Sequence, residues 1–291
     1  MWQHYIKENK NSIFEHNHQP QLCYITNTQG MQEYLPRMLH KHDEHLEIVF
    51  VAQGKGKHII DGTKYDTKAG DVLIFNQGVI HDEMAQLNSD MVTYCCGIRN
   101  LKIKGMEPNC LFDISAPAVI SSGEHKETIN KILEMMFFYV DKDLPNAHEF
   151  ANYLLLSLLT IIVSLPKQWI RPVFYKKRTL VDQVKDYLEQ NYTEPLTLSK
   201  IATRFKVSTS YLSHLFKKET KFSPIQYLNR RRIGEAQSLL MTTNQTITQI
   251  SIAVGYNDPN YFTAAFSKIT GISPKSYREL WIGQQLEFPK K

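Results

Sequence analysis

The chain has 291 residues, of which 42% are hydrophobic and 22% are charged, and its formal net charge is +5. This length predicts two domains with a core each, and the composition excludes a largely disordered chain. Residues 1–170 carry 15 Lys and Arg against 20 Asp and Glu, whereas residues 171–291 carry 19 against 9. The net charge is therefore −5 for residues 1–170 and +10 for residues 171–291, which predicts that the C-terminal third binds a polyanion such as DNA.

The sequence favours neither a membrane protein nor a secreted one. The longest apolar run, residues 153–165, is too short to span a bilayer and contains hydroxyl residues. The N-terminal residues are charged and lack the apolar core of a signal peptide. Zinc-site spacing is absent among the four cysteines, Cys23, Cys95, Cys96 and Cys110. We therefore expect reduced thiols, a cytoplasmic location and no membrane partner.

From about residue 22 to residue 103 the sequence favours short β-strands. Three β-rich runs, at residues 47–51, 57–60 and 71–75, are separated by Gly-containing turns. Many short strands joined by such turns predict a small barrel or a double-sheet jelly roll.

Between about residues 121 and 165 the apolar residues recur at helical spacing. The second of two helical patterns, from about His148, is apolar around most of its circumference, which predicts a buried helix. The simplest interpretation is a helical hairpin packed on the barrel. A compatible alternative is that residues 124–165 also form the seam of a homodimer, with the adaptable side chains of residues 135–138 facing the partner.

Residues 166–178 are interpreted as a linker, since Pro166 and Pro172 prevent helix continuation and a basic triplet follows at residues 176–178. We expect an effector-binding and dimerisation domain at residues 1–170, a linker at 171–178 and a DNA-binding domain at 179–291.

A pattern of aromatic, hydroxyl and proline residues occurs twice in the C-terminal third, at an offset of 50 residues. The first copy consists of Tyr211, Leu212, Phe216, Thr220, Ser223 and Pro224, and the second of Tyr261, Phe262, Phe266, Thr270, Ser273 and Pro274. A register held over this many positions indicates an internal repeat.

Each copy predicts a short helix, a tight turn and a second helix. Ser208 can cap the second helix of the first copy, whereas Thr246 and Gln249 form a capping box at the start of the second copy. Gly255 fits the left-handed position after a helix end. Two short helices with a tight turn are a helix-turn-helix, so an all-α domain of seven helices with two such motifs is predicted.

A long connecting helix is predicted from Ser223-Pro224 to about Leu240, with arginines at 230–232 around its surface. Its 17 or so residues, at about 1.5 Å each, could set two recognition helices about 34 Å apart, one turn of DNA. One chain would then cover two adjacent major grooves of double-stranded DNA.

This third of the chain resembles the DNA-binding domain of the AraC/XylS family of bacterial transcription regulators over residues 179–283. The resemblance is carried by Tyr211-Leu212, Phe216-Lys217-Lys218, Arg232, Ala236, Leu239-Leu240, Ile247, Ile250, Gly255-Tyr256, Tyr261-Phe262, Phe266, Ser273-Pro274 and Tyr277-Arg278. It implies a bacterial regulator that also contacts RNA polymerase. Ser251 and Ala264 depart from the family pattern, so we expect the first recognition helix to dominate sequence specificity.

The predicted barrel resembles the cupins. His40, His42 and Glu47 with Gly54 match the first cupin motif, and Gly70, Gly78 and His81 match the second. The resemblance implies that His40, His42, Glu47 and His81 are metal ligands in metal-binding cupins, and that they can instead contact an organic effector or only satisfy one another. A solvated His40 at the barrel rim is a further alternative.

We expect an effector contact and no cofactor, with the same four residues as the alternative metal ligands. The predicted effector-binding residues are Tyr24, Arg37, His40, His42, Glu47, His81 and Tyr94. The family resemblance suggests a sugar-type effector.

The predicted DNA-contacting residues lie opposite the apolar faces of the two recognition helices. In the first helix they are Thr209, Ser210, Ser213, His214 and Lys217, and in the second they are Pro259, Asn260, Thr263, Ala264 and Lys268. Asn260 could form a bidentate contact with adenine, and His214 or Ser210 could contact the edge of another base. For each Ser and Thr, a contact with phosphate or solvent is the alternative. Lys217, Lys268, Arg230 and Arg231 are expected to contact phosphate.

These patterns together predict an α+β two-domain regulator that activates a carbohydrate-utilisation operon as an effector-responsive homodimer. No catalytic residue is expected. The alternative from another class is a metal-dependent cupin enzyme fused to a DNA-binding domain. An alkyl-transfer repair protein with a similar DNA-binding domain would need a cysteine zinc cluster, which the sequence lacks.

Overall fold

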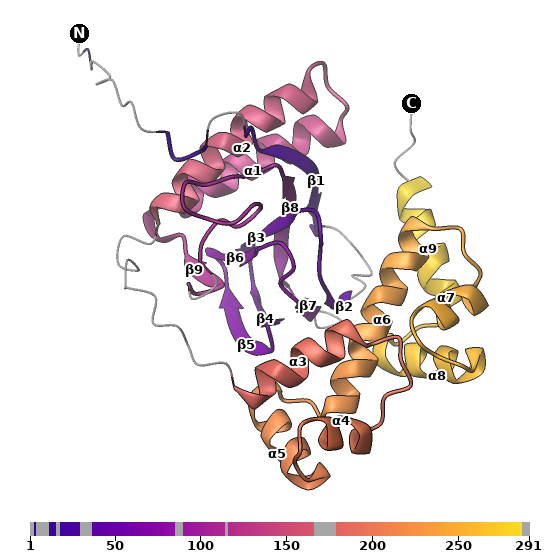
Figure 1. Ribbon diagram of the computed structural model, residues 1–291. Helices are drawn as coiled ribbons and strands as arrows, with labels where there is room; N and C mark the ends of the chain where they lie inside the picture. The colour runs from indigo at the N-terminus through magenta and orange to yellow at the C-terminus, as the bar shows by residue number, and fades with distance from the viewer. Residues whose placement is uncertain are drawn as a thin grey trace.

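The computed structural model describes residues 3, 12–15, 18–29, 37–84, 90–113, 116–165 and 179–286. Strands and a helical hairpin occupy the N-terminal part of the chain, and the C-terminal part is helical (Figure 1). The predicted linker at 171–178 lies outside the described residues.

Two antiparallel sheets form the N-terminal part, in the orders β1-β8-β3-β6-β9 and β2-β7-β4-β5. The larger sheet consists of β1 (Gln21–Asn27), β3 (Leu46–Gln53), β6 (Asp71–Phe75), β8 (Val92–Arg99) and β9 (Val119–Ser121). The smaller sheet consists of β2 (Arg37–His40), β4 (Lys55–Ile60), β5 (Thr63–Lys68) and β7 (His81–Met84). An apolar cluster that includes Val49, Ile60 and Leu73 fills the space between the sheets. The expected double-sheet arrangement is confirmed.

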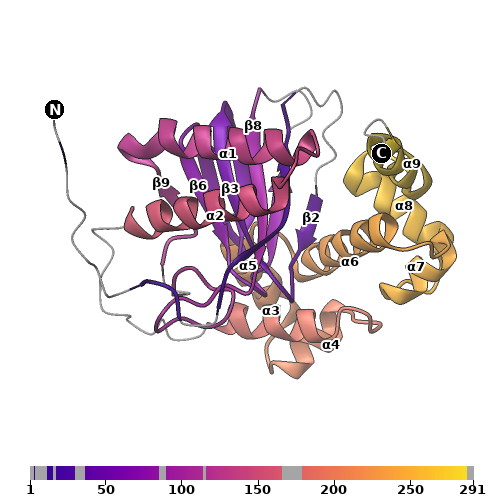
Figure 2. The ribbon, with the colours of Figure 1, turned by 90° about the horizontal axis from the view of Figure 1, so that it is seen from above.

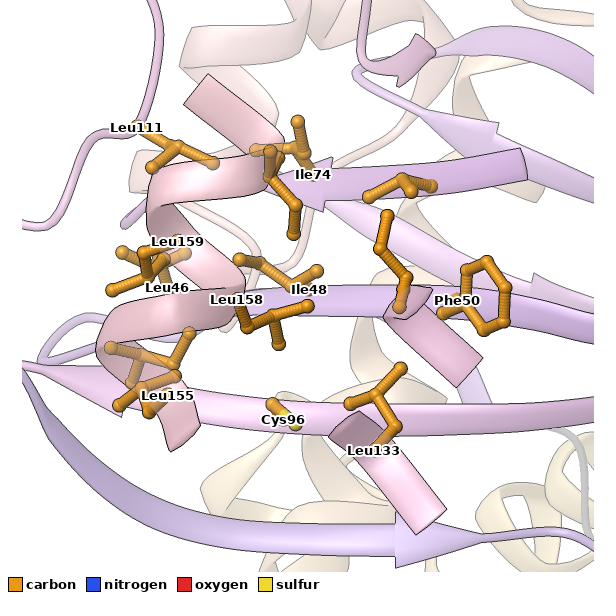
Figure 3. Close-up of a cluster of buried hydrophobic side chains, with 14 of the residues drawn as sticks. Leu46, Ile48, Phe50, Ile74, Cys96, Leu111, Leu133, Leu155, Leu158 and Leu159 are labelled. Atoms are coloured by element: carbon orange, nitrogen blue, oxygen red, sulfur yellow. The ribbon is translucent and has the colours of Figure 1, made fainter. Parts of the chain in front are cut away.

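The alternation of side chains along β3 defines two faces of the larger sheet. Ile48 and Phe50 point to the outer face, where α1 (Lys126–Asp141) and α2 (Ala147–Ser164) cover the sheet (Figures 2 and 3). Glu47 and Val49 alternate with these residues along β3 and therefore point to the opposite face. The carboxylate of Glu47 thus lies on the side of the second sheet. The expected helical hairpin is therefore present, and β3 separates its core from the polar interior.

Helix α2 is long and apolar enough to cross a membrane, with 18 residues and a mean hydropathy of 1.4. The core helix of a globular domain can have the same length and composition. Leu155 and Leu159 of α2 are fully buried in the cluster beneath the hairpin. Asn152 on the same helix accepts a hydrogen bond from the backbone amide of Leu22 in β1, at 2.9 Å. These contacts identify α2 as a core helix of the N-terminal part.

Seven helices follow in the described C-terminal residues 179–286, as expected. They are α3 (Leu180–Gln190), α4 (Leu198–Arg204), α5 (Thr209–Thr220), α6 (Pro224–Thr242), α7 (Ile247–Ala253), α8 (Pro259–Thr270) and α9 (Pro274–Leu286). Helices α4 and α5 form the first helix-turn-helix, and α7 and α8 form the second, with α6 between them (Figure 1).

The sequence repeat is also a structural repeat. The Thr220 hydroxyl donates to the Phe216 carbonyl at 2.8 Å, and the Thr270 hydroxyl donates to the Phe266 carbonyl at 2.9 Å. Phe216 meets the buried ring of Tyr227 edge-on, with centroids 5.5 Å apart, and Phe266 meets Tyr277 in the same way at 5.6 Å. The repeated residues therefore build the same core and helix end twice. The predicted capping box at Thr246 is present, and the predicted helix start at Ser223 also forms a capping box, with Gln226.

The helical part packs against the smaller sheet. Leu39, Ile59 and Ile80 are buried in one cluster with residues of α3 to α6, and Met38 is buried in a second cluster with residues of α6 to α9. Both views show β2 beside α6 (Figures 1 and 2). Lys185 of α3 donates to the carbonyl of Asp61, at the turn after β4, at 2.9 Å. The two parts of the chain thus share core residues.

Candidate DNA interface and effector site

The first recognition helix, α5, begins where the Ser208 hydroxyl accepts a hydrogen bond from the Tyr211 amide at 3.2 Å. Leu212 and Phe216 are fully buried and fix which face of α5 points inward. The opposite face carries the predicted DNA residues. Of these, Thr209, Ser210, His214 and Lys217 are exposed, and Ser213 is half-buried. Polar groups on one free helix face are suited to reading a major groove.

The second recognition helix, α8, has the same construction. Asp258 caps it by accepting from the Asn260 amide at 2.8 Å, and Phe262 and Phe266 are fully buried. Asn260, Ala264 and Lys268 are exposed, whereas Pro259 and Thr263 are half-buried. The Thr263 hydroxyl donates to the Pro259 carbonyl at 2.9 Å, so this proton is already used within the helix.

Two exposed tyrosines were not among the predicted contacts. Tyr211 on α5 is 55% exposed, and Tyr261 at the equivalent position of α8 is 60% exposed. Their place in the repeat was the available signal. The sequence did not distinguish these exposed rings from the core aromatics beside them.

The predicted phosphate contact of Arg231 is wrong in this structure. Its side chain is 4% exposed, and its guanidinium donates to Glu189 at 2.9 Å and to Glu235 at 2.8 Å. Arg232, also expected on the surface, is buried and donates to the carbonyls of Tyr192 and Glu194, at 2.6 and 2.7 Å. Arg231 joins α6 to α3, and Arg232 joins α6 to the segment that follows α3, so neither guanidinium is available to DNA.

Arg230 is turned toward the N-terminal part. Its Nη1 lies 3.5 Å from the Asp82 carboxylate, and its guanidinium stacks on the ring of Phe222, 4.5 Å from the centroid. A phosphate contact by Arg230 would compete with the Asp82 pair.

A buried polar cluster of His40, His42, Glu47 and His81 lies in the N-terminal part. One ligand atom from each of these four side chains lies within 4.8 Å of all the others. Strand β2 ends at His40, β7 begins at His81 and β3 carries Glu47. His40, Glu47 and His81 are 1%, 1% and 0% exposed, so the alternative of a solvated His40 is wrong. The structure thus brings together residues 41 positions apart in the sequence.

Backbone carbonyls orient two of these histidines. Nδ1 of His40 lies 2.8 Å from the Met38 carbonyl, and Nδ1 of His81 lies 3.0 Å from the Val79 carbonyl. A carbonyl can only accept, so both rings donate from Nδ1. In the neutral tautomer each Nε2 then presents a lone pair to the cluster.

Glu47 stands at the centre of the cluster. Its Oε2 lies 2.9 Å from His81 Nε2, and its Oε1 lies 3.2 Å from His42 Nε2 and also accepts from the Tyr24 hydroxyl. Burial alone would raise the pKa of Glu47, but the neighbouring His42 and His81 hold it well below its usual range. Two lone pairs facing at 2.9 Å require a proton or a cation between them. Glu47 and His81 therefore share a proton at this contact, or the cluster holds a cation.

The donor set fits a divalent transition metal. Bonds of about 2.0–2.1 Å to imidazole nitrogen and carboxylate oxygen place tetrahedral ligand atoms about 3.4 Å apart, and the donor atoms lie within 4.8 Å of one another. Nε2 of His40 is buried without a hydrogen-bond partner among the described residues. The Nδ1–carbonyl bonds are the outer contacts that metal-binding histidines usually make. His40, His42, Glu47 and His81 would hold such an ion.

Burial and the nearby charge of Arg37 lower the pKa of His40 well below its usual range. A neutral imidazole is the form that binds a metal or accepts from an effector hydroxyl. Arg37 itself lies between the two parts of the chain, with Nη2 3.5 Å from the Ser238 hydroxyl of α6.

Tyr24 joins the cluster, and Tyr94 does not. Burial, followed by the charge of Glu47, raises the pKa of Tyr24, so its hydroxyl remains a proton donor. Tyr94 is opposite Phe50 on the outer face of the sheet, where its ring lies 6.2 Å from that of Phe137 in α1. The prediction of Tyr94 as an effector contact is wrong for a ligand between the sheets, because alternation along β8 turns the ring away from Glu47.

His45 is a neighbour that the sequence did not single out. Its Nε2 lies 3.2 Å from the Tyr24 hydroxyl, and its ring stacks on His42 with centroids 4.1 Å apart. Spacing three residues after His42 was the only signal.

Two helix-turn-helix motifs with free polar faces, attached to a β-domain with a buried polar cluster, define a DNA-binding regulator with a ligand-binding domain. Residues 201–280 match the family described as Helix-turn-helix domain. Residues 19–102 match the family described as AraC-like ligand binding domain. The chain belongs to the AraC family of transcription regulators.

Three relatives extend across most of the chain. The uncharacterized HTH-type transcriptional regulator YdiP of Escherichia coli (strain K12) is 29% identical over 242 residues, which cover 82% of this chain and 80% of YdiP. The HTH-type transcriptional activator RhaR of Mannheimia succiniciproducens is 25% identical, with 85% and 89% covered. The lactose operon transcription activator of Staphylococcus xylosus is 26% identical, with 78% and 81% covered. Both matched domains and these relatives are transcription regulators, not enzymes.

Proposed function

We propose that this protein activates a carbohydrate-utilisation operon in response to a small sugar-type effector bound between its two sheets. The observation that supports DNA recognition most directly is the matched pair of polar faces on α5 and α8. Each face is held outward by two fully buried side chains of its own helix. Two relatives are transcription activators by name, and one of these serves a lactose operon. These names support an activating role and a sugar-type effector.

The proposed effector site contains Tyr24 and the cluster of His40, His42, Glu47 and His81. Hydroxyl groups of a sugar can donate to Glu47 and to the imidazole nitrogens, and can accept from Tyr24. The apolar side chains between the sheets, such as Phe75, which stacks on His81 at 4.0 Å, would cover the sugar ring. Effector binding would favour one arrangement of the DNA-binding helices, which is the basis of the regulation.

We further propose a homodimer through α1 and α2, residues 124–165. Met135, Phe138 and Tyr153 are 46%, 53% and 58% exposed on these helices, which is unusual for apolar side chains that serve only the core of one chain. A dimer would cover two half-sites on DNA and could contact RNA polymerase from a fixed position. Such a protein would act in the bacterial cytoplasm.

The test has two stages with the full-length protein. Selection from a random duplex library should give a site with two recognition blocks about one helical turn apart, in line with two recognition helices per chain. Recovery of no preferred sequence would contradict the proposal. A panel of mono- and disaccharides is then screened by thermal shift, and any stabilising sugar is added to a DNA-affinity measurement.

The matched variants for the second stage are Glu47→Gln and Phe138→Glu. Glu47→Gln should remove the response to the sugar and leave basal DNA affinity within about twofold. Phe138→Glu should shift the protein to monomer in sedimentation and leave the sugar-induced thermal shift intact. A sugar response that survives Glu47→Gln would place the effector elsewhere.

A further inference from the structure

Strand β2 belongs to both parts of the protein. Its last residue, His40, contributes an imidazole to the polar cluster. The two preceding residues, Met38 and Leu39, are 4% and 0% exposed and pack into the cores of the helical part. A strand of four residues therefore connects the ligand cluster to the DNA-binding helices directly.

A register irregularity makes this double role possible. In a regular strand Met38 and Leu39 would point to opposite faces. The pairing of β2 with β7 shifts between Arg37 and His40, which is the signature of a bulge. Leu39 packs with the helices around the first motif, Met38 packs with those around the second, and His40 turns toward Glu47.

Strand β2 and helix α6 are in close contact through their backbones. The Met38 amide donates to the side-chain oxygen of Gln237 at 2.8 Å. A Cβ at Gly234 would overlap the Leu39 carbonyl, so helix and strand meet backbone to backbone. A shift of β2 would therefore move α6 or break the contact.

Strand β7 forms a second connection of the same kind. His81 faces Glu47, and the next residue, Asp82, is fully buried and lies 3.5 Å from Nη1 of Arg230 on α6. The two strands that supply cluster histidines at this edge of the smaller sheet each contact α6 through adjacent residues.

We infer that occupation of the His40, His42, Glu47 and His81 cluster by a divalent cation is energetically coupled to the docking of α6 on β2. A cation bound by His40 and His81 together with Glu47 fixes β2 and β7 relative to β3. That is the position in which Met38, Leu39 and Asp82 meet α6. Cation binding therefore favours the docked arrangement, and by linkage docking strengthens cation binding by the same factor. A cation and the proposed sugar would use the same donor atoms of the cluster, so they are alternative occupants of it. The inference rests on the proposed function only in that a change in docking would act on a DNA-binding regulator.

The primary experiment uses the full-length protein and Zn²⁺ alone. Zn²⁺ affinity is measured by competition with a chelating dye, and amide hydrogen exchange is measured with and without saturating Zn²⁺. We expect one ion per chain and slower exchange in Zn²⁺ for the Met38 amide and the peptides of α6 around Gly234. Absence of Zn²⁺ binding, or binding that leaves exchange of β2 and α6 unchanged, would overturn the inference.

Reciprocity is tested with a variant in the DNA-binding part. Gly234→Ala removes a helix-destabilising residue from α6 but places a methyl group against the Leu39 carbonyl, so the helix should form while docking weakens. We expect Zn²⁺ affinity to fall about tenfold, a typical coupling factor. Thr242→Ala, at the exposed C-terminal end of the same helix, is the matched control and should retain wild-type Zn²⁺ affinity.

Two further outcomes have defined meanings. Equal Zn²⁺ affinity in wild type and Gly234→Ala, with faster exchange of the Met38 amide in the variant, would show that docking and the cluster are independent. His40→Ala should lose Zn²⁺ binding and the Zn²⁺-dependent protection of α6 together. Failure of these metal measurements leaves selection of a DNA site untouched, so the inference and the proposed function can fail separately.

Discussion

Nε of Arg231 lies 2.9 Å from Oε2 of Glu189, joining α6 to the first helix of the DNA-binding part. Glu235 completes the arrangement from the next turn of α6, at 2.8 Å, and the Tyr192 ring lies under the guanidinium at 4.6 Å. Burial raises the pKa of Glu189, and the charge of Arg231 opposes this shift. The pair is thus a structural element beneath the first helix-turn-helix.

Arg231→Ala should destabilise the protein and is not a test of phosphate contact. Removing one partner of a buried ion pair leaves the other charge buried, which costs about 3–5 kcal/mol. Urea denaturation should show this loss as a lower midpoint. Lys217→Ala, an exposed position on α5, is the control and should change stability by less than about 0.5 kcal/mol. An Arg231→Ala protein as stable as the control would contradict the structural role.

Lys217→Ala and Lys268→Ala should each weaken binding to specific and nonspecific DNA about equally. Both side chains are exposed near the C-terminal ends of the recognition helices. Loss of one phosphate contact lowers the slope of log affinity against log salt by about 0.9. Anisotropy titrations across a salt series measure both quantities. A loss confined to one sequence would instead indicate a base contact.

Asn260→Ala should relax specificity at one base pair. The side chain is exposed at the second position of α8, and a bidentate contact with adenine is worth about 1–3 kcal/mol of discrimination. Affinity for the selected site and for its single-base variants should be compared in wild type and variant. The loss should vanish on the duplex that lacks that adenine. A uniform loss over all duplexes would reassign Asn260 to the backbone.

His58 should make the fold acid-sensitive. Burial, followed by the charge of His81, lowers its pKa from 6.5 to about 4. The unfolded chain therefore takes up a proton below pH 6.5 that the folded chain takes up only near pH 4, and stability falls across this window by about 3 kcal/mol. His40, whose pKa is also lowered, contributes in the same direction.

Denaturation curves of wild type and His58→Leu between pH 7.5 and pH 4 test this contribution. The variant should lose less stability than wild type as the pH falls from 6.5. Above pH 7 the histidine is neutral in both states, so the two stability curves should run parallel there. An equal loss of stability below pH 6.5 in both proteins would show that His58 does not cause the acid sensitivity.

Local pattern was enough for the helical part. Helix periodicity, the caps at Ser208, Ser223 and Thr246 and the left-handed Gly255, with a φ of 91°, all act within a few residues of the chain. The internal repeat then provided the same pattern a second time, at an offset of 50 residues. This is why seven helices and the outward faces of α5 and α8 could be predicted.

Sequence patterns did not predict which side chains are buried where a helix or strand packs against other elements on two faces. The sequence predicted that α6 buries one apolar face and exposes Arg231 and Arg232. In the structure both arginines are buried, because Glu189 and backbone carbonyls accept their hydrogen bonds. Tyr94 was assigned by residue type, and only the pairing of β8 with β3 set its direction. The four residues of the cupin-like motif do lie together, because the motif spacing mirrors neighbouring strands.

By itself, the sequence determined the elements, their ends and the polar faces of the recognition helices, because each depends on backbone hydrogen bonds and side chains within one or two turns. Tertiary structure decided which charges are free, which side of a strand meets the cluster, and that Met38 and Leu39 enter the cores of the DNA-binding part. These outcomes depend on contacts between residues up to about 200 positions apart, such as Met38 with Gln237. These contacts are stabilised by burial and close packing, which cannot be deduced from periodicity along the chain.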